Sequence, residues 1–494
     1  MKILDVISQI EQEILVSNNN YKINIDKECT DITTMYQNIK TSSVFILKAS
    51  NRSKIYAEKA ISKNPILILT NMEENSLDDM KSDIPVIYLS NYASAINKLV
   101  HLFYDKYIES LKFIAVTGTN GKTTTSHMVG KILSKLDKRV AVVGTLGVYD
   151  SKFNKMNFNH STPTTPTTPM HIEFAEIIKY FAEKNYDYIV YEATSIALDQ
   201  KRVNFIYNEL AIFTNFSSEH LEYHHTLENY LEAKLKLNSL SKKSIVNYDS
   251  EEYRKIGYDR YHFSNNQKND MYYKYSIEEN KLSIWIDGNV YQINIALNGI
   301  HNYINLAISI FAIHKLNFDI KNILEVVKYI KPPDNRFEIF KIREFEFILD
   351  FAHTPLAINE SISEAIKYSS KKRKKLTVML TGIGLRGLDK IRDTMNLIPN
   401  NIDQIILASE QVGFENENHI IATMIKYLPE YYDLNNIMIA SSRKEAIKKI
   451  VEKTKSDESI ILLTGINEPQ HYRGGLINHD DKSYIKMCIN NKLV

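Results

Sequence analysis

The sequence has little cysteine, almost no net charge and no long apolar run. Its 2 cysteines, Cys29 and Cys488, lie far apart and form neither a metal-binding spacing nor a disulfide framework, which fits a reducing cytoplasm. A formal net charge of +2 gives no reason to expect a nucleic acid or an anionic membrane as a partner. No stretch approaches the roughly 18 apolar residues of a transmembrane helix, and Asp5 near the start is unlike a signal peptide. We therefore expect a cytoplasmic protein without membrane or nucleic-acid partners.

Composition and length favour a globular protein of several domains. The hydrophobic content of 44% and the charged content of 24% are typical of globular chains. The 494 residues exceed the roughly 250–300 residues at which a single core stops growing. We find no internal repeat, no long low-complexity tract and no interface stripe, so a monomer is the default expectation.

The most informative stretch is Val116-Thr-Gly-Thr-Asn-Gly-Lys-Thr-Thr-Thr125. A short apolar run precedes it and apolar residues at helical spacing follow it, which predicts a glycine turn between a strand and a helix. Gly118 and Gly121 allow backbone N–H groups to face an anion, Lys122 adds positive charge for terminal phosphates, and the Thr123 hydroxyl can bind Mg²⁺. Only two residues separate the glycines, fewer than in the common nucleotide-binding loop. In this context the stretch still predicts ATP binding rather than an ordinary turn.

Apolar runs of strand length alternate with helix-like stretches along the chain, which predicts an α/β protein of three domains. Residues 1–111 form a small α/β domain for substrate recognition, and residues 112–332 form the central ATP-binding domain with a mostly parallel sheet. Lys331-Pro-Pro-Asp-Asn-Arg336 is the clearest linker, because two prolines interrupt both helix and strand. Residues 333–494 form a third, Rossmann-like α/β domain. Within the central domain, Asp287-Gly288 predicts a hairpin turn.

Polar residues at and after two further strands are candidates for metal binding. Glu192 ends an apolar strand, where a carboxylate can hold Mg²⁺ beside a phosphate loop, although a surface glutamate fits equally well. Residues 219–225 contain three histidines and two glutamates, which suggests a metal or phosphate site or else a polar loop. By itself, Lys234 is an ordinary lysine on a helix surface.

Taken in this order, the motifs resemble the Mur ligase family, whose members join an amino acid or peptide to a carboxylate through an acyl phosphate. Thr117–Thr124 matches the short phosphate loop of that family. Gly144–Gly147, Thr167–Pro169 and Glu192–Leu198 are similar to the branch that adds the third residue of the peptidoglycan stem peptide. The resemblance implies an ATP- and Mg²⁺-dependent ligase that adds an amino acid to UDP-N-acetylmuramoyl-dipeptide or a related carboxylate.

The resemblance also implies roles for individual residues. Metal ligation is implied for Thr123, Glu192, His220 and Lys234, with Lys234 carbamylated to a pseudo-carboxylate. The implied catalytic residues are Lys122, Lys234, His220 and Arg336. ATP contacts are implied for Gly118, Thr119, Asn120, Gly121, Lys122, Thr123, Thr124, Asn302, Arg336 and Asp350. Substrate contacts are expected for Thr167, Thr168, Thr194, Ser195, Arg202, His353, Arg386, Arg392, Glu410 and Glu468.

The substrate motifs depart from the family more than the ATP motifs do. Family members that use meso-diaminopimelate carry an arginine for its distal carboxylate, and the matching stretch here, Ser409–Gly413, has none. A buried carboxylate without its bidentate partner binds poorly, which disfavours that amino acid. Glu410 could instead face the amine of a basic amino acid.

Two alternatives stay open at the level of sequence. A related ligase could keep the chemistry and join an amino acid to an acceptor outside peptidoglycan, in capsule or secondary-metabolite assembly. A catalytically silent ATP-binding scaffold belongs to a different class, and the retained metal-binding and phosphate-binding residues argue against it.

Overall fold

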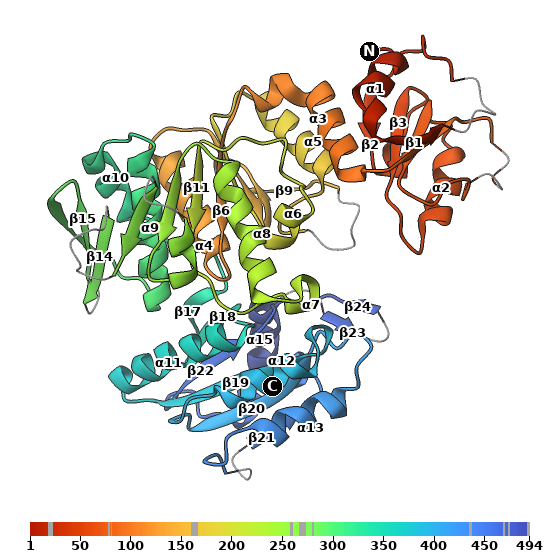
Figure 1. Cartoon of the computed structure of the whole chain (residues 1–494). Coiled ribbons are helices and arrows are strands. Elements are labelled where there is room, and N and C mark those ends of the chain that lie inside the picture. Colours follow the sequence, from red (N-terminus) through yellow and green to blue (C-terminus); the bar gives the residue numbers. More distant parts are fainter. Residues whose placement is uncertain are drawn as a thin grey trace. The chain divides into compact units, whose positions relative to one another are not determined.

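The computed structural model describes the chain except residues 18–22, 78–79, 81, 160–165, 257–259, 266–272, 279–280, 434–436, 468–469, 473–474 and 492–494. The chain divides into two compact units. The first is Met1–Asn294 with Asn305–Ile330, and the second is Ile295–Ile304 with Lys331–Val494. Helices and strands alternate in both (Figure 1), so the predicted α/β class is confirmed. Among the described residues, no helix is long and apolar enough to cross a membrane.

The first unit begins with a small sheet of strand order β1-β5-β4-β3-β2. Strands β2 to β5 pair in parallel, and β1 joins β5 antiparallel. Every residue of β3 and β4 is buried, as expected for parallel strands covered on both faces. The elements are α1 (Ile3–Gln9), β1 (Ile14–Ser17), β2 (Asp31–Thr33), β3 (Ser43–Leu47), α2 (Ser53–Ile61), β4 (Leu67–Thr70), β5 (Val86–Leu89) and α3 (Tyr92–Ile108).

The same unit holds an 11-stranded sheet of order β16-β15-β14-β13-β12-β11-β6-β10-β7-β8-β9. Its centre, from β7 to β14, is parallel, and both ends are antiparallel. The strands are β6 (Lys112–Thr117), β7 (Val140–Gly144), β8 (Gly147–Tyr149), β9 (Lys155–Met156), β10 (Tyr188–Glu192), β11 (Leu210–Phe213), β12 (Ser244–Asn247), β13 (Tyr261–Ser264), β14 (Tyr273–Glu278), β15 (Lys281–Ile286) and β16 (Asn289–Asn294).

The α-helices described in this part of the chain are α4 (Lys122–Lys135), α5 (His171–Ala182), α6 (Ser195–Asp199), α7 (Leu221–His224), α8 (Leu227–Ser239), α9 (Ile300–Lys315) and α10 (Ile320–Val327). The start of α9, up to Ile304, belongs to the second unit. Because β10 and β11 flank β6 in parallel, Glu192 pairs with Val116 and Phe213 pairs with Thr117. The turn after β6 therefore lies beside the segments that follow Glu192 and Phe213, at the edge where ligands bind in open α/β sheets.

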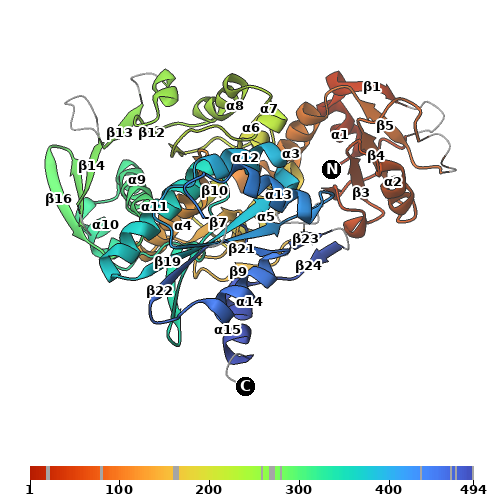
Figure 2. The same ribbon diagram turned by 90° about the horizontal axis from the view of Figure 1, so that it is seen from below.

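The second unit is built on a six-stranded sheet of order β17-β18-β22-β19-β20-β21, in which only the β17–β18 pair is antiparallel. Helices α11, α12 and α13 cover one face, and α14 and α15 cover the other (Figure 2). The elements are β17 (Arg336–Ile342), β18 (Phe345–Asp350), α11 (Pro355–Lys372), β19 (Lys375–Ile383), α12 (Leu388–Asn396), β20 (Gln404–Glu410), α13 (Glu417–Tyr427), β21 (Ile437–Ala440), α14 (Arg443–Lys453), β22 (Ser459–Thr464), β23 (Gln470–Tyr472), β24 (Gly475–Ile477) and α15 (Asp481–Asn491).

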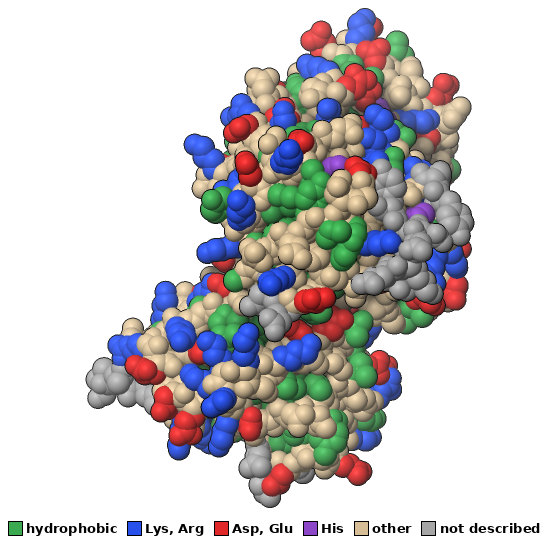
Figure 3. Space-filling view, turned by 90° about the vertical axis from the view of Figure 1, so that its left-hand side faces the viewer, with side chains coloured by type: hydrophobic (Ala, Val, Ile, Leu, Met, Phe, Trp, Pro, Cys, Tyr) green, Lys and Arg blue, Asp and Glu red, His purple; other side chains and the backbone are tan. Residues whose placement is uncertain are grey.

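Two surface features agree with the sequence. Asp287 and Gly288, both with positive φ, join β15 to β16, so the predicted hairpin is confirmed. Acidic and basic side chains are interspersed over the face seen in Figure 3, as expected from 61 basic and 59 acidic residues.

Candidate active site

The predicted phosphate loop lies between β6 and α4, as the sequence indicates. Gly118 has φ +149°, and a Cβ there would lie 1.9 Å from Oγ1 of Thr214. Gly121 has φ +83°, and a Cβ there would lie 2.7 Å from Oδ1 of Asn305. Both positions therefore require glycine, because the conformation and the close neighbours exclude a side chain.

The segment that follows β11 holds the loop in place. The backbone N–H of Thr119 donates to the carbonyl of Asn215 at 2.9 Å, and the N–H of Asn120 donates to Oδ1 of Asn215 at 2.8 Å. Thr124 is buried in the first turn of α4. The Lys122 ammonium folds back over the loop and donates to the carbonyls of Gly118 and Thr119, at 2.9 and 2.8 Å. This arrangement keeps a cation on the phosphate loop.

Glu192 is fully buried at the end of β10 and faces the loop helix. Its Oε2 accepts from the Thr123 hydroxyl at 3.0 Å, and its Oε1 accepts from the backbone N–H of Thr145 at 2.8 Å. A Cβ on Gly144 would lie 2.0 Å from Oε1, so the carboxylate has room at this position only because residue 144 is glycine. Thr123 and Glu192 thus bring together two oxygen donors of the kind that Mg²⁺ prefers.

Lys234 on α8 is almost fully buried, and its Nζ donates to the carbonyl of Gly118 at 2.8 Å. No carboxylate forms a salt bridge with it within the described part of the chain. Burial first, and the charge of Lys122 second, hold the pKa of Lys234 well below its usual value, while Glu219 opposes the shift. Burial and the Lys122 charge thus favour the neutral amine more than in an exposed lysine.

His220 precedes α7, and its Nδ1 lies 3.3 Å from Oε1 of Glu222. The described residues contain no group of three or more His, Cys, Asp or Glu side chains placed to hold a metal ion. The structure brings Thr123 and Glu192 into hydrogen-bond contact, and Lys234 bonds to the Gly118 carbonyl on the same loop.

The predicted substrate residues of the first unit form a hydrogen-bonded group next to Glu192. Thr168 donates to the carbonyl of Glu192 at 2.7 Å, and its Oγ1 lies 3.0 Å from that of Thr194. The Arg202 guanidinium donates to the carbonyl of Thr168 at 3.3 Å. Thr167 lies 3.1 Å, hydroxyl to hydroxyl, from Thr145. These contacts place residues from three chain segments side by side.

A pocket of about 770 Å³ in the first unit is lined by Lys48, His171 and Arg202. Burial lowers the pKa of both cations, and the charge of Arg202 lowers that of Lys48 further. Burial and the two cations lower the pKa of His171 to about 3, so this imidazole is neutral. Nε and Nη2 of Arg202 both donate to the neutral amide oxygen Oε1 of Gln200, at 2.9 and 2.6 Å. Lys59 also lines this pocket, and a wall with three basic side chains favours an anionic ligand.

The nucleotide residues predicted for the second unit also lie together. Asn302 is fully buried and donates to the carbonyl of Arg336 at 3.0 Å, whereas its Oδ1 is buried without a hydrogen-bond partner among the described residues. Arg336 pairs with Asp350 across the β17–β18 ladder, and its guanidinium lies 4.7 Å from the ring centre of Phe351. His353 is two residues further on, with Nδ1 2.8 Å from the Phe351 carbonyl.

The structure corrects the interpretation of Glu410. This side chain is fully buried, its Oε2 accepts from Arg443 at 2.7 Å, and its Oε1 accepts from the backbone N–H of Ile466 at 2.6 Å. Arg443 also donates to both carboxylate oxygens of Asp481, at 2.9 and 2.6 Å, and to the carbonyl of Thr464. Because both of its oxygens are bonded to internal groups at a fully buried position, Glu410 does not face the amine of a substrate.

The other predicted substrate residues of this unit differ in their surroundings. Arg392 on α12 forms salt bridges with Asp389 and Asp393 of its own helix, at 2.9 and 3.1 Å. Arg386 follows the end of β19. Glu468 lies outside the described residues.

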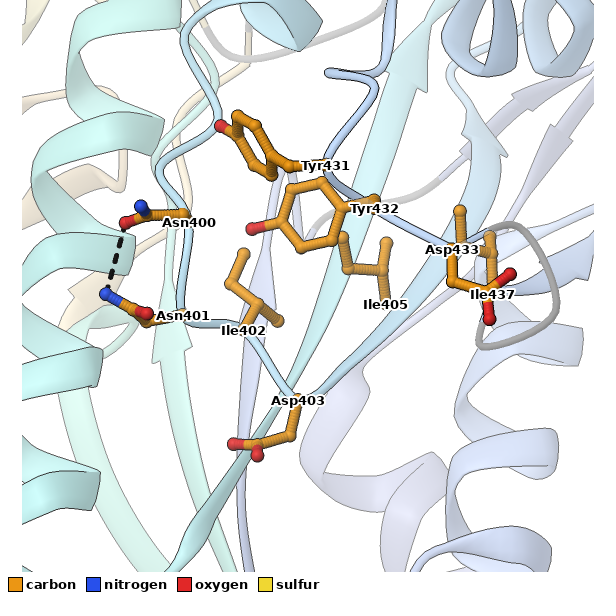
Figure 4. Close-up of a pocket in the computed structure, with 9 residues that line it drawn as sticks. All are labelled: Asn400, Asn401, Ile402, Asp403, Ile405, Tyr431, Tyr432, Asp433 and Ile437. Carbon is orange, nitrogen blue, oxygen red and sulfur yellow. Dashed lines mark hydrogen bonds between the residues drawn. The ribbon is translucent and has the colours of Figure 1, made fainter.

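A smaller pocket of about 330 Å³ lies at the opposite end of the same sheet (Figure 4). Asp403 and Ile437 line it where β20 and β21 begin, whereas Glu410 ends β20. The hydroxyls of Tyr431 and Tyr432 already donate to backbone carbonyls. None of the predicted site residues lines this pocket, so it takes no part in the site.

The fold and the loop geometry define a phosphate-binding α/β protein, and its relatives are ligases. The chain matches the Mur ligase middle domain over residues 116–313 and the glutamate ligase domain of Mur ligases over residues 335–466. It is similar to the UDP-N-acetylmuramoyl-L-alanyl-D-glutamate–2,6-diaminopimelate ligase of Rickettsia rickettsii, with 30% identity covering 90% of this chain and 92% of that protein. It is also similar to the ligase of the same name from Clostridium tetani, with 29% identity and 99% of each chain covered.

The chain belongs to the Mur ligase family. A solved diaminopimelate ligase of the same name has the same fold, with a TM-score of 0.61, 20% identity, and 100% of this chain and 99% of that one covered. MurF from Acinetobacter baumannii gives a TM-score of 0.66 at 14% identity, covering 99% of this chain and 98% of that one. Mur ligases use ATP and Mg²⁺, and a MurF ligase from Thermotoga maritima has been solved in complex with ADP.

Sequence reasoning missed several residues that contact the predicted site residues. Tyr230 contacts Thr119, hydroxyl to hydroxyl, at 3.1 Å, and the ring of the same tyrosine lies 4.6 Å from Nζ of Lys234. Thr145 was contained in a family motif, but nothing in the sequence marked it as a partner of Glu192. Arg443 carried no local signal at all.

Proposed function

We propose that this ligase joins an amino acid to the carboxylate of a nucleotide-sugar peptide, with UDP-N-acetylmuramoyl-dipeptide as the acceptor, in peptidoglycan precursor synthesis. The observation that carries the proposal is the arrangement on Gly118, whose carbonyl accepts from both Lys122 and Lys234 while Thr123 bonds to Glu192. The anionic acceptor matches the pocket lined by Lys48 and Arg202. The names of the relatives support the choice of acceptor.

The proposed reaction has two steps. The γ-phosphoryl group of ATP is transferred to the acceptor carboxylate, and the amine of the amino acid then attacks the acyl phosphate, which forms the amide and releases phosphate. Such a transfer needs positioning and charge neutralisation rather than a protein nucleophile. On the first unit, Lys122 neutralises phosphate charge, and Thr123 and Glu192 would hold Mg²⁺, which adds further neutralisation when bound.

The second unit is proposed to bind the nucleoside and to add a cation. The unpaired Oδ1 of Asn302 is an acceptor suited to the exocyclic amine of adenine, and Asp350 is proposed to bind the ribose. Arg336 is proposed to contact the ATP phosphates. His220 is proposed to complete the metal site on the first unit.

We also propose a role for each segment of the chain, a cellular location and an oligomeric state. Segments 1–111, 112–332 and 333–494 are proposed to serve acceptor recognition, ATP binding and amino-acid binding, and each segment contains one of the three larger sheets. The protein is proposed to be a cytoplasmic monomer, for which light scattering at the mass of two chains would be contrary evidence.

We propose that Lys234 is carbamylated. The neutral form of a lysine amine adds CO₂ at nitrogen and loses one proton, which leaves a carbamate anion, and the lowered pKa of Lys234 favours that neutral form. We expect protein incubated with ¹³C-bicarbonate to show a carbamate carbon signal that is absent from the Lys234→Met variant. The matched control is Lys236→Met on the same helix, because Lys236 is a surface lysine bound to Asp199 at 2.7 Å. A signal retained in Lys234→Met would reject the assignment.

Phosphate release tests the function itself. Purified protein with ATP and Mg²⁺ is combined with a panel of amino acids, each with and without UDP-N-acetylmuramoyl-dipeptide. We expect release only when the dipeptide and one amino acid are both present, because the acyl phosphate needs both a carboxylate and an amine. Phosphate release that does not depend on the dipeptide would indicate an acceptor outside peptidoglycan. No phosphate release despite ATP binding would favour a catalytically silent scaffold.

A further inference from the structure

The short helix α7 is held between two backbone conformations that side chains rarely adopt. His220, just before it, has φ 55° and ψ 30°, and His225, just after it, has φ 66° and ψ −38°. The N–H of Thr226 donates to the carbonyl of His224 at 2.8 Å, so His225 is the centre of a γ-turn with positive φ. Strained residues of this kind persist only where the surroundings hold them, and they gather at functional sites.

Helix α6 supplies the side chains that hold α7. Nε2 of His224 and Oγ of Ser195 share a hydrogen bond of 3.0 Å, and both side chains are buried. One turn away, the Tyr223 hydroxyl donates to Oδ2 of Asp199 at 3.2 Å. Asn229 of α8 donates to the carbonyl of His224 at 3.0 Å, which fixes the other side of the turn.

These contacts connect the segments that carry the predicted metal ligands. Helix α6 begins three residues after Glu192, α7 begins directly after His220, and Lys234 lies on the helix that follows. The ring of Tyr230 lies 5.3 Å from that of His224 and 6.1 Å from that of His220. The position of α7 on α6 therefore decides where His220 lies relative to Glu192.

We propose that Ser195 and His224 form a positioning pair, which holds the strained turn at α7 and thereby presents His220 to the metal ion. The proposal rests on the proposed function for the identity of that metal. It assigns Ser195 an internal role in place of the substrate contact expected from the sequence, since its hydroxyl is bonded to His224 and the residue is 2% exposed.

Ser195→Ala tests the pair, because it removes one hydroxyl and leaves the packing in place. In the ligand-free full-length variant we expect the amides of His224, His225 and Thr226 to exchange with solvent roughly five- to tenfold faster, as one hydrogen bond is lost. We expect the same variant to bind Mn²⁺, as a probe for Mg²⁺ in the presence of ADP, with an affinity reduced by a similar factor. The matched control is Ser239→Ala on α8, which should change neither measurement, since within the described part of the chain its hydroxyl bonds to the Lys236 carbonyl.

Strain relief separates positioning from a general loss of packing. Glycine adopts φ 66° without cost, so adding His225→Gly to Ser195→Ala should restore both the exchange rates and the Mn²⁺ affinity. Unchanged exchange and affinity in Ser195→Ala would overturn the proposal, and so would a weakened affinity that His225→Gly does not restore. If the wild-type chain binds no Mn²⁺ with ADP, the proposed function fails together with the metal role of the pair, whereas the exchange data still decide whether Ser195 holds α7.

Discussion

Replacement of Lys122 by alanine is expected to lower ATP turnover by at least about 10³-fold, because phosphoryl transfer depends on cations placed around the transferred group. The Lys122 ammonium already lies over the loop, bonded to the carbonyls of Gly118 and Thr119. No other side chain of the loop carries a positive charge. The measurement is phosphate release under the conditions that support turnover in the wild type.

The control is Lys135→Ala, which removes a lysine from the exposed end of the same helix. It should leave turnover unchanged, and both variants should unfold at the wild-type temperature. Turnover in Lys122→Ala within tenfold of the wild type would contradict the assignment of the loop. Because Lys122 contributes to the depressed pKa of Lys234, its loss should also move that pKa upward.

The Arg443→Met variant is expected to lose about 3–5 kcal/mol of stability in the second unit, because removal of one partner leaves buried charges without compensation. Arg443 is fully buried and is bonded to Glu410 and to both oxygens of Asp481. Adding Glu410→Gln and Asp481→Asn to Arg443→Met should recover most of the loss, since no buried ion then remains. A surface control is Arg392→Met, which should leave the unfolding midpoint unchanged.

The effect of pH has a defined sign. In the wild type, the Arg443 guanidinium and His479 hold the pKa of Asp481 at about 2 against the opposing effect of burial. This folded-state pKa lies below the unfolded value, so the stability from Asp481 is present above about pH 4 and is lost as the pH falls toward 2. Burial already raises the pKa of Glu410 in the wild type, and loss of Arg443 removes an effect that lowers the pKa of both Glu410 and Asp481. The deficit of the variant should therefore grow as the pH rises from 5 to 8.

Urea unfolding followed by two signals can assign the loss to one unit. Trp285, the sole tryptophan, is in β15 of the first unit, so its fluorescence reports that unit and should not change. Hydrogen exchange of the β19, β20 and β22 amides reports the second unit and should show the loss. Equal stability of the β20 amides in wild type and Arg443→Met would contradict the buried ion network.

Features that depend on a few consecutive residues could be predicted from the sequence. The strand, glycine turn and helix at Val116–Thr125 were predicted correctly, because Gly118 and Gly121 adopt positive φ angles that residues with a side chain rarely adopt. The Asp287-Gly288 hairpin follows from the same rule. The α/β class followed from alternating strand and helix patterns, which are also local.

Only the tertiary structure decided which side chains meet across long stretches of chain. The sequence left Glu410 open to a substrate amine, but packing places Arg443, from another strand–helix unit, against it in a buried site. Packing likewise sets Ser195 against His224 and Lys234 against the Gly118 carbonyl, although neither pair has a sequence signal. The physical reason is that a backbone conformation is fixed by neighbouring residues, whereas the charge and hydrogen-bond partners of a buried side chain are fixed by the segments that fold against it.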